Sequence, residues 1–389
     1  MTGQDSVAVR GSGEPVELPA APRYGSRSVG EVMTSAAAAL GVPGFENALS
    51  LPAAQRFVVV LVDGLGSRLL SQVRGYAPTL RSAQSLGELD AAFPSTTSVS
   101  LSCLGTGRTP GRHGMLGYDV LDPDTDRVVN MLGNWPASLD PLAWQPGATV
   151  LERTAQHVDT VTVSSPRFES SALTRAVLRG GRFVGAQGVH ARTARALEQL
   201  KEGRRGLVYF YWDDLDKTGH KQGWRSDAWL HALEELDSAL KRLVTRLPAN
   251  TRVVLTADHG MVDVALEGRI DVSAVPELMR GVRNTAGEPR AVQLHLEPGV
   301  SPEDVVGRWR EHFGDAVWLA TRDELVGSGH FGPDPEPAML ARAGDVWVLA
   351  REDIALYDVA RQGTRPLAMV GQHGSLTEQE RAVPALLWG

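Results

Sequence analysis

Four continuous apolar runs recur along the chain, and each ends in polar or acidic residues. They occupy residues 57–66 (FVVVLVDGLG), 160–165, 206–214 and 252–260. Such runs are typical of strands in a parallel sheet, which are buried on both faces because helices cover each side. Between the runs, apolar residues recur at helical spacing, most clearly in residues 230–244. The pattern predicts an α/β core in which helices flank a mostly parallel central sheet.

The sequence pattern changes between residues 264 and 366, where short strand patterns surround a single amphipathic helical pattern. We therefore expect residues 264–366 to form a smaller inserted α+β module that covers the sheet as a cap or lid. The catalytic core would then be discontinuous, with residues 51–263 and 367–389. Residues 1–50 are rich in Gly, Pro, Ser and Ala, and we expect them to form a peripheral arm.

Composition places the chain among ordinary globular proteins, with 389 residues, 42% hydrophobic and 22% charged. The single cysteine, Cys103, excludes an intramolecular disulfide. No apolar stretch is long enough to span a bilayer, and the N-terminus has no hydrophobic signal core. We therefore expect a cytoplasmic protein with no membrane partner. The sequence leaves the oligomeric state open and is compatible with a monomer, since no heptads indicate a coiled coil.

The formal net charge of −7 does not favour binding to long nucleic acid. If the substrate is a phosphate ester, its charge needs a local source of positive charge. Bound metal ions are the obvious source, because they are often the largest charges in a site.

Acidic residues and histidines gather just after the apolar runs. The carboxyl ends of parallel strands meet at one edge of a sheet, so these side chains are expected to share a cleft. Carboxylate and imidazole groups together suit zinc, manganese or iron. Taken singly, each of these residues has a simpler structural explanation, since Asp-Gly after a strand is usually a turn and a lone histidine is usually structural. The candidates are Asp63, Asp216, His220, Asp258, His259 and His373.

A further segment, residues 93–118, strengthens the prediction of a metal site. Its Pro-Ser-Thr-Thr sequence is a helix-start signal, followed by residues apolar enough for a buried helix. A threonine at a helix N-terminus gains the positive end of the dipole and free N–H groups, which suit a phosphoryl oxygen. A neighbouring metal can lower the pKa of its hydroxyl and make it a nucleophile. Alternatively, these hydroxyls only cap the helix.

Six short motifs follow one another in a fixed order: VDG, FP-x-x-T, TG-x-x-P-x-x-HG, D-x-x-GH, ADHGM and a late HG. In carrying these motifs in this order, the chain resembles the alkaline phosphatase superfamily, specifically its nucleotide pyrophosphatase/phosphodiesterase branch. The resemblance covers most of residues 57–265 and returns at 371–374. It implies an alkaline-phosphatase-like core and an in-line displacement at phosphorus that passes through a phospho-threonine.

The same resemblance implies roles for individual residues. Thr97 matches the nucleophile, because it is the third residue after Pro94. One metal ion would be held by Asp216, His220 and His373. The other would be held by Asp63, Asp258 and His259, with the Thr97 oxygen at the same ion. The cofactors expected are thus two divalent ions, with Mn²⁺ preferred and Zn²⁺ as the alternative.

The chain departs from the branch at two positions. Many members carry an asparagine near the place of Tyr118, and an aromatic residue where this chain has Ser98. Tyr118 is therefore the candidate substrate-binding residue. Trp135, Trp144 and Trp224 could border the cleft, although buried packing is the more common role of tryptophan.

A narrower resemblance is to the actinobacterial cyclic di-AMP phosphodiesterases of this superfamily. The spacing from Asp216 to His373 is similar to theirs, and 35 arginines against four lysines fit a high-GC genome. The substrate implied is cyclic di-AMP, opened to pApA and then cut to AMP. The alternatives are a nucleotide pyrophosphatase, a phosphonate hydrolase, a phosphomonoesterase, or a catalytically silent nucleotide-binding protein. The complete set of candidate ligands and the nucleophile argue against a silent protein.

Overall fold

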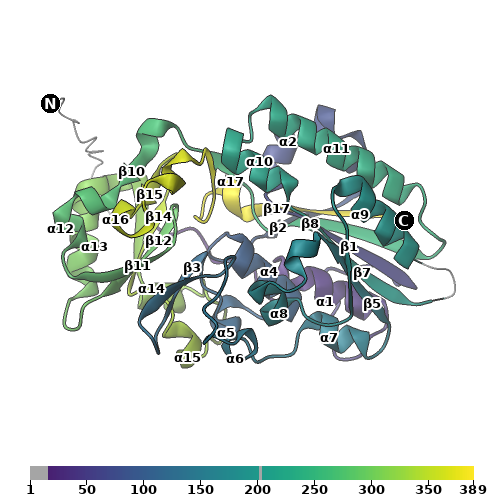
Figure 1. Cartoon of the computed structure of the whole chain (residues 1–389), viewed down its shortest axis with the longest axis horizontal. Coiled ribbons are helices and arrows are strands. Elements are labelled where there is room, and N and C mark those ends of the chain that lie inside the picture. The colour runs from purple at the N-terminus through teal and green to yellow at the C-terminus, as the bar shows by residue number, and fades with distance from the viewer. Residues whose placement is uncertain (1–15, 201–203) are drawn as a thin grey trace.

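A seven-stranded sheet forms the centre of the larger half of the molecule (Figure 1). The computed structural model describes residues 16–200 and 204–389. The sheet order is β2-β17-β8-β1-β7-β5-β6, and only β17 runs against the others. The expected mostly parallel α/β core is confirmed. Its strands are β1 Arg56–Val62, β2 Gln84–Asp90, β5 Asp159–Ser164, β6 Arg182–Gly185, β7 Gly206–Trp212, β8 Thr251–Ala257 and β17 Ala382–Trp388.

The central strands are apolar along their whole length because helices cover both faces of the sheet. Strand β1 reads RFVVVLV, and all of its residues are buried. One layer of helices contains α2 Ser67–Gln72, α9 Val189–Gln199, α10 Asp214–Gln222 and α11 Asp227–Val244 (Figure 1). The opposite layer contains α1 Gly30–Ala39, α4 Thr97–Thr106, α7 Val150–Ala155 and α8 Ala172–Val177.

The register of the three middle strands determines where the acidic residues lie. Val62 at the end of β1 pairs with Trp212 of β7 on one side and with Ala257 of β8 on the other. The next residue of each strand is an aspartate, namely Asp63, Asp213 and Asp258. Three carboxylates therefore leave the sheet at the same level of its carboxyl edge.

The interpretation of residues 1–50 as a peripheral arm is wrong for the part from residue 28 onward. Helix α1 packs against α4 and the central sheet, and its residues Val32, Met33 and Ala36 are fully inaccessible to solvent. The small side chains of this alanine-rich helix allow the close approach of α1 and α4. Residues 1–15 lie outside the described residues.

A second, antiparallel sheet forms the smaller half, in the order β13-β14-β12-β11-β3-β4. Four strands and the helix α13 Pro302–Phe313 come from the expected insertion. The hairpin of β3 and β4 comes from residues 119–130, which were assigned to the core; Asp119 of β3 pairs with Gly287 of β11. The module is therefore larger than the range 264–366. Its strands are β3 Asp119–Asp122, β4 Arg127–Asn130, β11 Val282–Glu288, β12 Ala291–Leu296, β13 Val317–Thr321 and β14 Val346–Ala350.

The remaining elements are short. Two small sheets pair β9 Val262–Asp263 with β16 Gly371–Gln372, and β10 Arg269–Asp271 with β15 Ala355–Tyr357. The short helices are α3 Pro78–Ser82, α5 Pro110–His113, α6 Pro141–Trp144, α12 Pro276–Met279, α14 Arg322–Gly327, α15 Pro337–Leu340, α16 Val359–Gln362 and α17 Glu378–Arg381.

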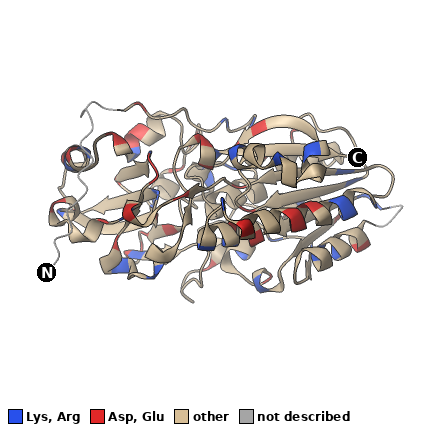
Figure 2. Ribbon diagram, turned by 90° about the horizontal axis from the view of Figure 1, so that it is seen from above, with Lys and Arg blue, Asp and Glu red and all other residues tan. Residues whose placement is uncertain are grey.

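Charged residues of both signs are interspersed over both halves of the described chain (Figure 2). Among the described residues, none of the helices is both long and apolar enough to cross a membrane.

A buried ion pair joins the two halves. Arg290, in the turn between β11 and β12, donates from Nε and Nη2 to the two carboxylate oxygens of Glu380 in α17, each at 2.8 Å. Its Nη1 donates to the carbonyl oxygens of Glu352 and Ile354, also at 2.8 Å. Neither charged side chain is accessible to solvent. The guanidinium is thus fully satisfied, and it anchors the smaller half to the core.

Replacing Arg290 with methionine should destabilise the protein by about 3–5 kcal/mol, because Glu380 would remain as an unpaired buried charge. Urea unfolding measures this free energy. The double variant Arg290→Met/Glu380→Leu should recover much of the loss, since it leaves no buried charge. A single variant within the error of the wild type would contradict the anchoring role.

Candidate functional site

Two aspartates and one histidine form a buried group at the carboxyl edge of the sheet. Asp63 follows β1, and Asp258 and His259 follow β8. The Nε2 atom of His259 lies 3.4 Å from an oxygen of Asp63 and 3.4 Å from Oδ2 of Asp258. The other oxygen of Asp258 accepts the N–H groups of Gly64 at 3.1 Å and of His259 at 3.0 Å. One carboxylate oxygen of Asp258 is thus held by the backbone, and the other faces His259.

A second group shares His259 with the first. Ligand atoms of Asp216, His259 and His373 lie within 4.8 Å of one another, as do those of Asp63, Asp258 and His259. The rings of His259 and His373 stack with their centroids 3.5 Å apart. His220 lies beside this group, with Nε2 3.3 Å from Asp216. The structure therefore gathers all six candidates, with His259 between the two groups and His220 at their margin.

The three imidazoles are oriented by backbone carbonyl groups. In each ring Nδ1 lies within hydrogen-bonding distance of a carbonyl oxygen, which leaves Nε2 directed at the carboxylates. The partners are Gly371 for His220 at 2.7 Å, Gly260 for His259 at 2.9 Å, and Ser95 for His373 at 3.0 Å. Burial and the neighbouring imidazoles hold the pKa of His373 well below its usual value. A neutral histidine with a free Nε2 is the form that binds a metal ion.

The carboxylates are crowded and only partly satisfied. Burial raises the pKa of Asp63 well above its usual value, and the nearby charges of Asp258 and Asp216 add to this effect. Within the described chain, Oδ1 of Asp216 and Oδ2 of Asp258 are buried and have no hydrogen-bond partner. A buried carboxylate without partners is costly unless a cation neutralises it. The donor set of oxygens and imidazole nitrogens therefore fits divalent metal ions.

Thr97 faces the first group from the beginning of helix α4. Its hydroxyl oxygen is 3.1 Å from Nε2 of His259 and 3.5 Å from an oxygen of Asp63. Thr96 is the N-cap, so Thr97 occupies the first helical position, where backbone N–H groups lack helical partners. Ser95, which precedes the N-cap, donates its backbone N–H to the carbonyl oxygen of Gly374 at 3.0 Å. That contact ties the start of the helix to the segment of His373.

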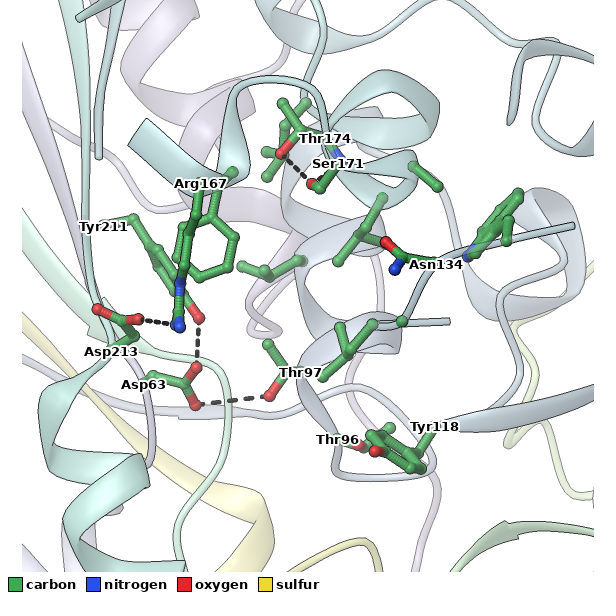
Figure 3. Close-up of a pocket in the computed structure, with 18 of the residues that line it drawn as sticks. Asp63, Thr96, Thr97, Tyr118, Asn134, Arg167, Ser171, Thr174, Tyr211 and Asp213 are labelled. Carbon is green, nitrogen blue, oxygen red and sulfur yellow. Dashed lines mark hydrogen bonds and ion pairs between the residues drawn. The ribbon is translucent and has the colours of Figure 1, made fainter. Parts of the chain in front are cut away.

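Tyr211 is a site residue that the sequence did not reveal. It lies on β7, and its hydroxyl donates to the second oxygen of Asp63 (Figure 3). Within the apolar run of residues 206–214 it reads as one more buried aromatic residue. Its position one residue before the carboxyl end of the strand is the only available signal in the sequence.

A cavity of about 980 Å³ opens beside the two groups and extends between α8 and the segment of residues 132–141. Tyr118 and Trp135 both line this cavity. The sequence suggests a place in the cleft for Tyr118 and leaves it open for Trp135. Tyr118 is 39% exposed. In contrast, Trp144 and Trp224 are buried packing residues, each 3% exposed. The cavity is within the range of volumes found for small-molecule sites.

Glu288 is a second residue that the sequence did not single out. It ends β11 in the smaller half and lines the cavity next to Thr96. Its Oε2 accepts the backbone N–H of Tyr118 at 3.0 Å, whereas Oε1 is buried with no partner among the described residues. A Cβ at Gly374 would stand 2.4 Å from Cγ of Glu288, so glycine is required there. Burial raises the pKa of Glu288 to about 8.

Fold and site together define a class of protein: an α/β protein with a candidate metal cluster at the carboxyl edge of a parallel sheet. The family model described as type I phosphodiesterase / nucleotide pyrophosphatase matches residues 57–376. The chain therefore belongs to the type I phosphodiesterase/nucleotide pyrophosphatase family. This is the branch that the resemblance in the sequence implied.

Solved structures show the same fold. Murine ectonucleotide pyrophosphatase/phosphodiesterase 5 is 15% identical, with a TM-score of 0.65, covering 85% of this chain and 87% of that chain. Phosphonoacetate hydrolase from Sinorhizobium meliloti 1021 is 18% identical, with a TM-score of 0.66, covering 86% and 90%. Among curated proteins, a phosphopentomutase of Anaeromyxobacter sp. (strain K) is 37% identical over 120 residues. That match spans 30% of this chain and only 28% of the phosphopentomutase.

Glu288→Gln should change how stability depends on pH. A carboxyl group with a folded-state pKa of about 8 contributes stability at low pH that is lost as pH rises to that value. Glutamine does not titrate, so the variant should gain about 1–3 kcal/mol on the wild type between pH 5 and pH 8. Urea unfolding with a chelator at both pH values measures this gain. The exposed Glu169→Gln is the control, and an equal gain in both variants would contradict the burial effect.

Proposed function

We propose that this protein is a two-metal phosphodiesterase in which Thr97 is the nucleophile. The observation that carries the proposal is the placing of the Thr97 hydroxyl 3.1 Å from Nε2 of His259, the residue that both candidate metal groups share. A nucleophile beside such a shared ligand would be placed to attack a phosphate ester bound at a two-metal site.

The two groups would each hold one divalent ion. Asp63, Asp258 and His259 would hold the first, beside Thr97. Asp216 and His373 would hold the second, with His220, whose Nε2 faces Asp216. When bound, such ions polarise phosphoryl oxygens and stabilise both the attacking and the leaving oxygen. Mn²⁺ is the preferred cofactor and Zn²⁺ the alternative, since both accept carboxylate and imidazole ligands.

The chain itself positions the reacting groups. The N–H groups at the start of α4 and the helix dipole favour an anionic phosphoryl group next to Thr97. The Thr97 oxygen attacks phosphorus, the bond to the leaving alkoxide breaks, and a phospho-threonine forms. Water then attacks the same phosphorus and frees Thr97. Tyr211 fixes Asp63 throughout by donating to its second oxygen.

Cyclic di-AMP is the substrate that we propose, with pApA and then AMP as products. The cavity of about 980 Å³ supports a substrate larger than a simple phosphomonoester. The half-buried Phe168 and Phe183 line it and are candidates for base stacking, which is worth about 1–3 kcal/mol per base. An inactive form of murine ectonucleotide pyrophosphatase/phosphodiesterase 5 was solved with AMP, which favours a nucleotide ligand for this fold. The protein is proposed to act in the cytoplasm, without membrane or long nucleic-acid partners.

A phosphonate hydrolase is the second candidate, because phosphonoacetate hydrolase is a structural neighbour of similar coverage. A nucleotide pyrophosphatase or phosphomonoesterase would use the same groups. The cavity's size and aromatic lining favour the dinucleotide over these smaller substrates.

Purified protein with Mn²⁺ should cleave cyclic di-AMP to pApA and AMP, resolved by chromatography. In a panel with nucleoside triphosphates, bis-p-nitrophenyl phosphate, p-nitrophenyl phosphate and phosphonoacetate, we expect the highest kcat/KM for cyclic di-AMP, because this ratio measures discrimination. A higher kcat/KM for phosphonoacetate would instead identify a phosphonate hydrolase.

Thr97→Ala should lower kcat by roughly 10³ or more, because it removes the attacking oxygen. Thr106→Ala, at the far end of the same helix, is the matched control and should keep wild-type activity. Acid-quenched wild-type protein should carry a phosphoryl adduct in the tryptic peptide that contains Thr97, detected by mass spectrometry. Turnover by the Thr97→Ala variant at the wild-type rate would exclude this nucleophile.

A further inference from the structure

Three cationic side chains surround one buried carboxylate at the edge of the cavity. Asp213 follows β7 and is 4% exposed in its side chain. One of its oxygens accepts hydrogen bonds from Nη2 of Arg167 at 2.7 Å and from Lys217, and the other accepts from Arg192 at 3.2 Å. Burial opposes ionisation, but the hydrogen bond from Lys217 and the charges of Arg192 and Arg167 hold the pKa of Asp213 below its usual value. The carboxylate is therefore ionised and fixes these cations in place.

The positive charge of this cluster exceeds its negative charge. Asp214 is the second carboxylate, 3.3 Å from Arg192 and 3.8 Å from Lys217. Three cations thus face two carboxylates, which leaves one positive charge in excess. Arg192 is buried, with a side chain 4% exposed, and serves both carboxylates. The excess charge is therefore presented by the two exposed members, Arg167 and Lys217.

Both of these members line the same cavity as Thr97. The side chain of Arg167 is 54% exposed, and that of Lys217 is 44% exposed. Figure 3 shows Arg167 bonded to Asp213, and the same lining of the cavity includes Tyr211 and Asp63. A guanidinium has five N–H donors, and the bond to Asp213 occupies one of its nitrogens. The group is thus held in position while most of its donors remain available.

We propose that Arg167 and Lys217 form a phosphate subsite that binds a second phosphate of the substrate, distinct from the phosphate that Thr97 attacks. The inference rests on the proposed function and specifies its substrate class, namely dinucleotides that carry two phosphate groups. Arginine suits this role because its planar donor pair matches a phosphate, and the stacking of Arg167 on Phe168, 4.4 Å from the ring centroid, fixes its plane.

The test compares two ligands that differ by one phosphate. In the Thr97→Ala protein loaded with Mn²⁺, titration calorimetry measures the Kd of pApA and of ApA, which lacks the terminal phosphate. We expect pApA to bind at least about tenfold more tightly, as a charge-assisted bidentate contact allows. Adding Arg167→Ala should remove most of this difference, because only Lys217 of the subsite remains, and should weaken the binding of pApA more than that of ApA. Arg167→Lys should retain part of it, because the charge remains.

Arg195→Ala is the matched control. Arg195 is similarly exposed, at 54%, and is paired with Glu198 at 2.8 Å, but it is not among the residues that line the cavity. This variant should keep the full difference between pApA and ApA.

Three results would overturn the subsite: equal affinities of the parent for pApA and ApA, no measurable binding of pApA, or a loss in Arg167→Ala that is the same for both ligands. The last would show that Arg167 only supports the local structure. The proposed function has a separate readout, the turnover of cyclic di-AMP by the wild type, so its failure is distinguishable from failure of the subsite.

Discussion

Electrostatic crowding of buried carboxylates is the constraint on which the rest of the structure depends. Asp63, Asp216 and Asp258 are all buried, and two of their oxygens have no hydrogen-bond partner in the described chain. The nearest groups that can balance them are imidazoles, and the raised pKa of Asp63 reflects the same crowding. Such an arrangement costs stability in a protein that binds no cation. The overall charge of −7 is thus no obstacle to an anionic substrate, because metal ions would set the local potential.

The sheet register produces this crowding, and this part could be predicted from the sequence. Continuous apolar runs identify strands that are buried on both faces, and their last residues are followed by aspartates. Once β1 pairs in parallel with β7 and β8, Asp63 and Asp258 must meet at one edge. The helix start before Thr97 was equally readable, because proline and hydroxyl residues have strong local preferences there. Local pattern and strand order together therefore brought the candidate ligands to one place.

Other features depend on contacts that no local pattern encodes. The two groups share His259 because His373 stacks on it. These histidines are far apart in the sequence, and their spacing along the chain does not predict how close they lie in space. Glu288 and Arg290 lie in an ordinary strand and turn, and become informative only through partners in other segments. The hairpin of residues 119–130 joins the second sheet through strands too short to show a clear alternation. The alanines of α1 are buried by packing against α4. The sequence of the segment does not reveal this contact, so the sequence alone predicts a peripheral arm.

We propose that the crowded carboxylates hold two divalent ions, and measuring the metal content of the protein tests this proposal. Protein produced without added metal would be equilibrated with Mn²⁺, freed of excess ion, and measured by elemental analysis. We expect about two ions per chain, and fewer in an Asp258→Asn variant that keeps its fold. Fewer than one ion per chain in the wild type, or the same content in the variant, would contradict it.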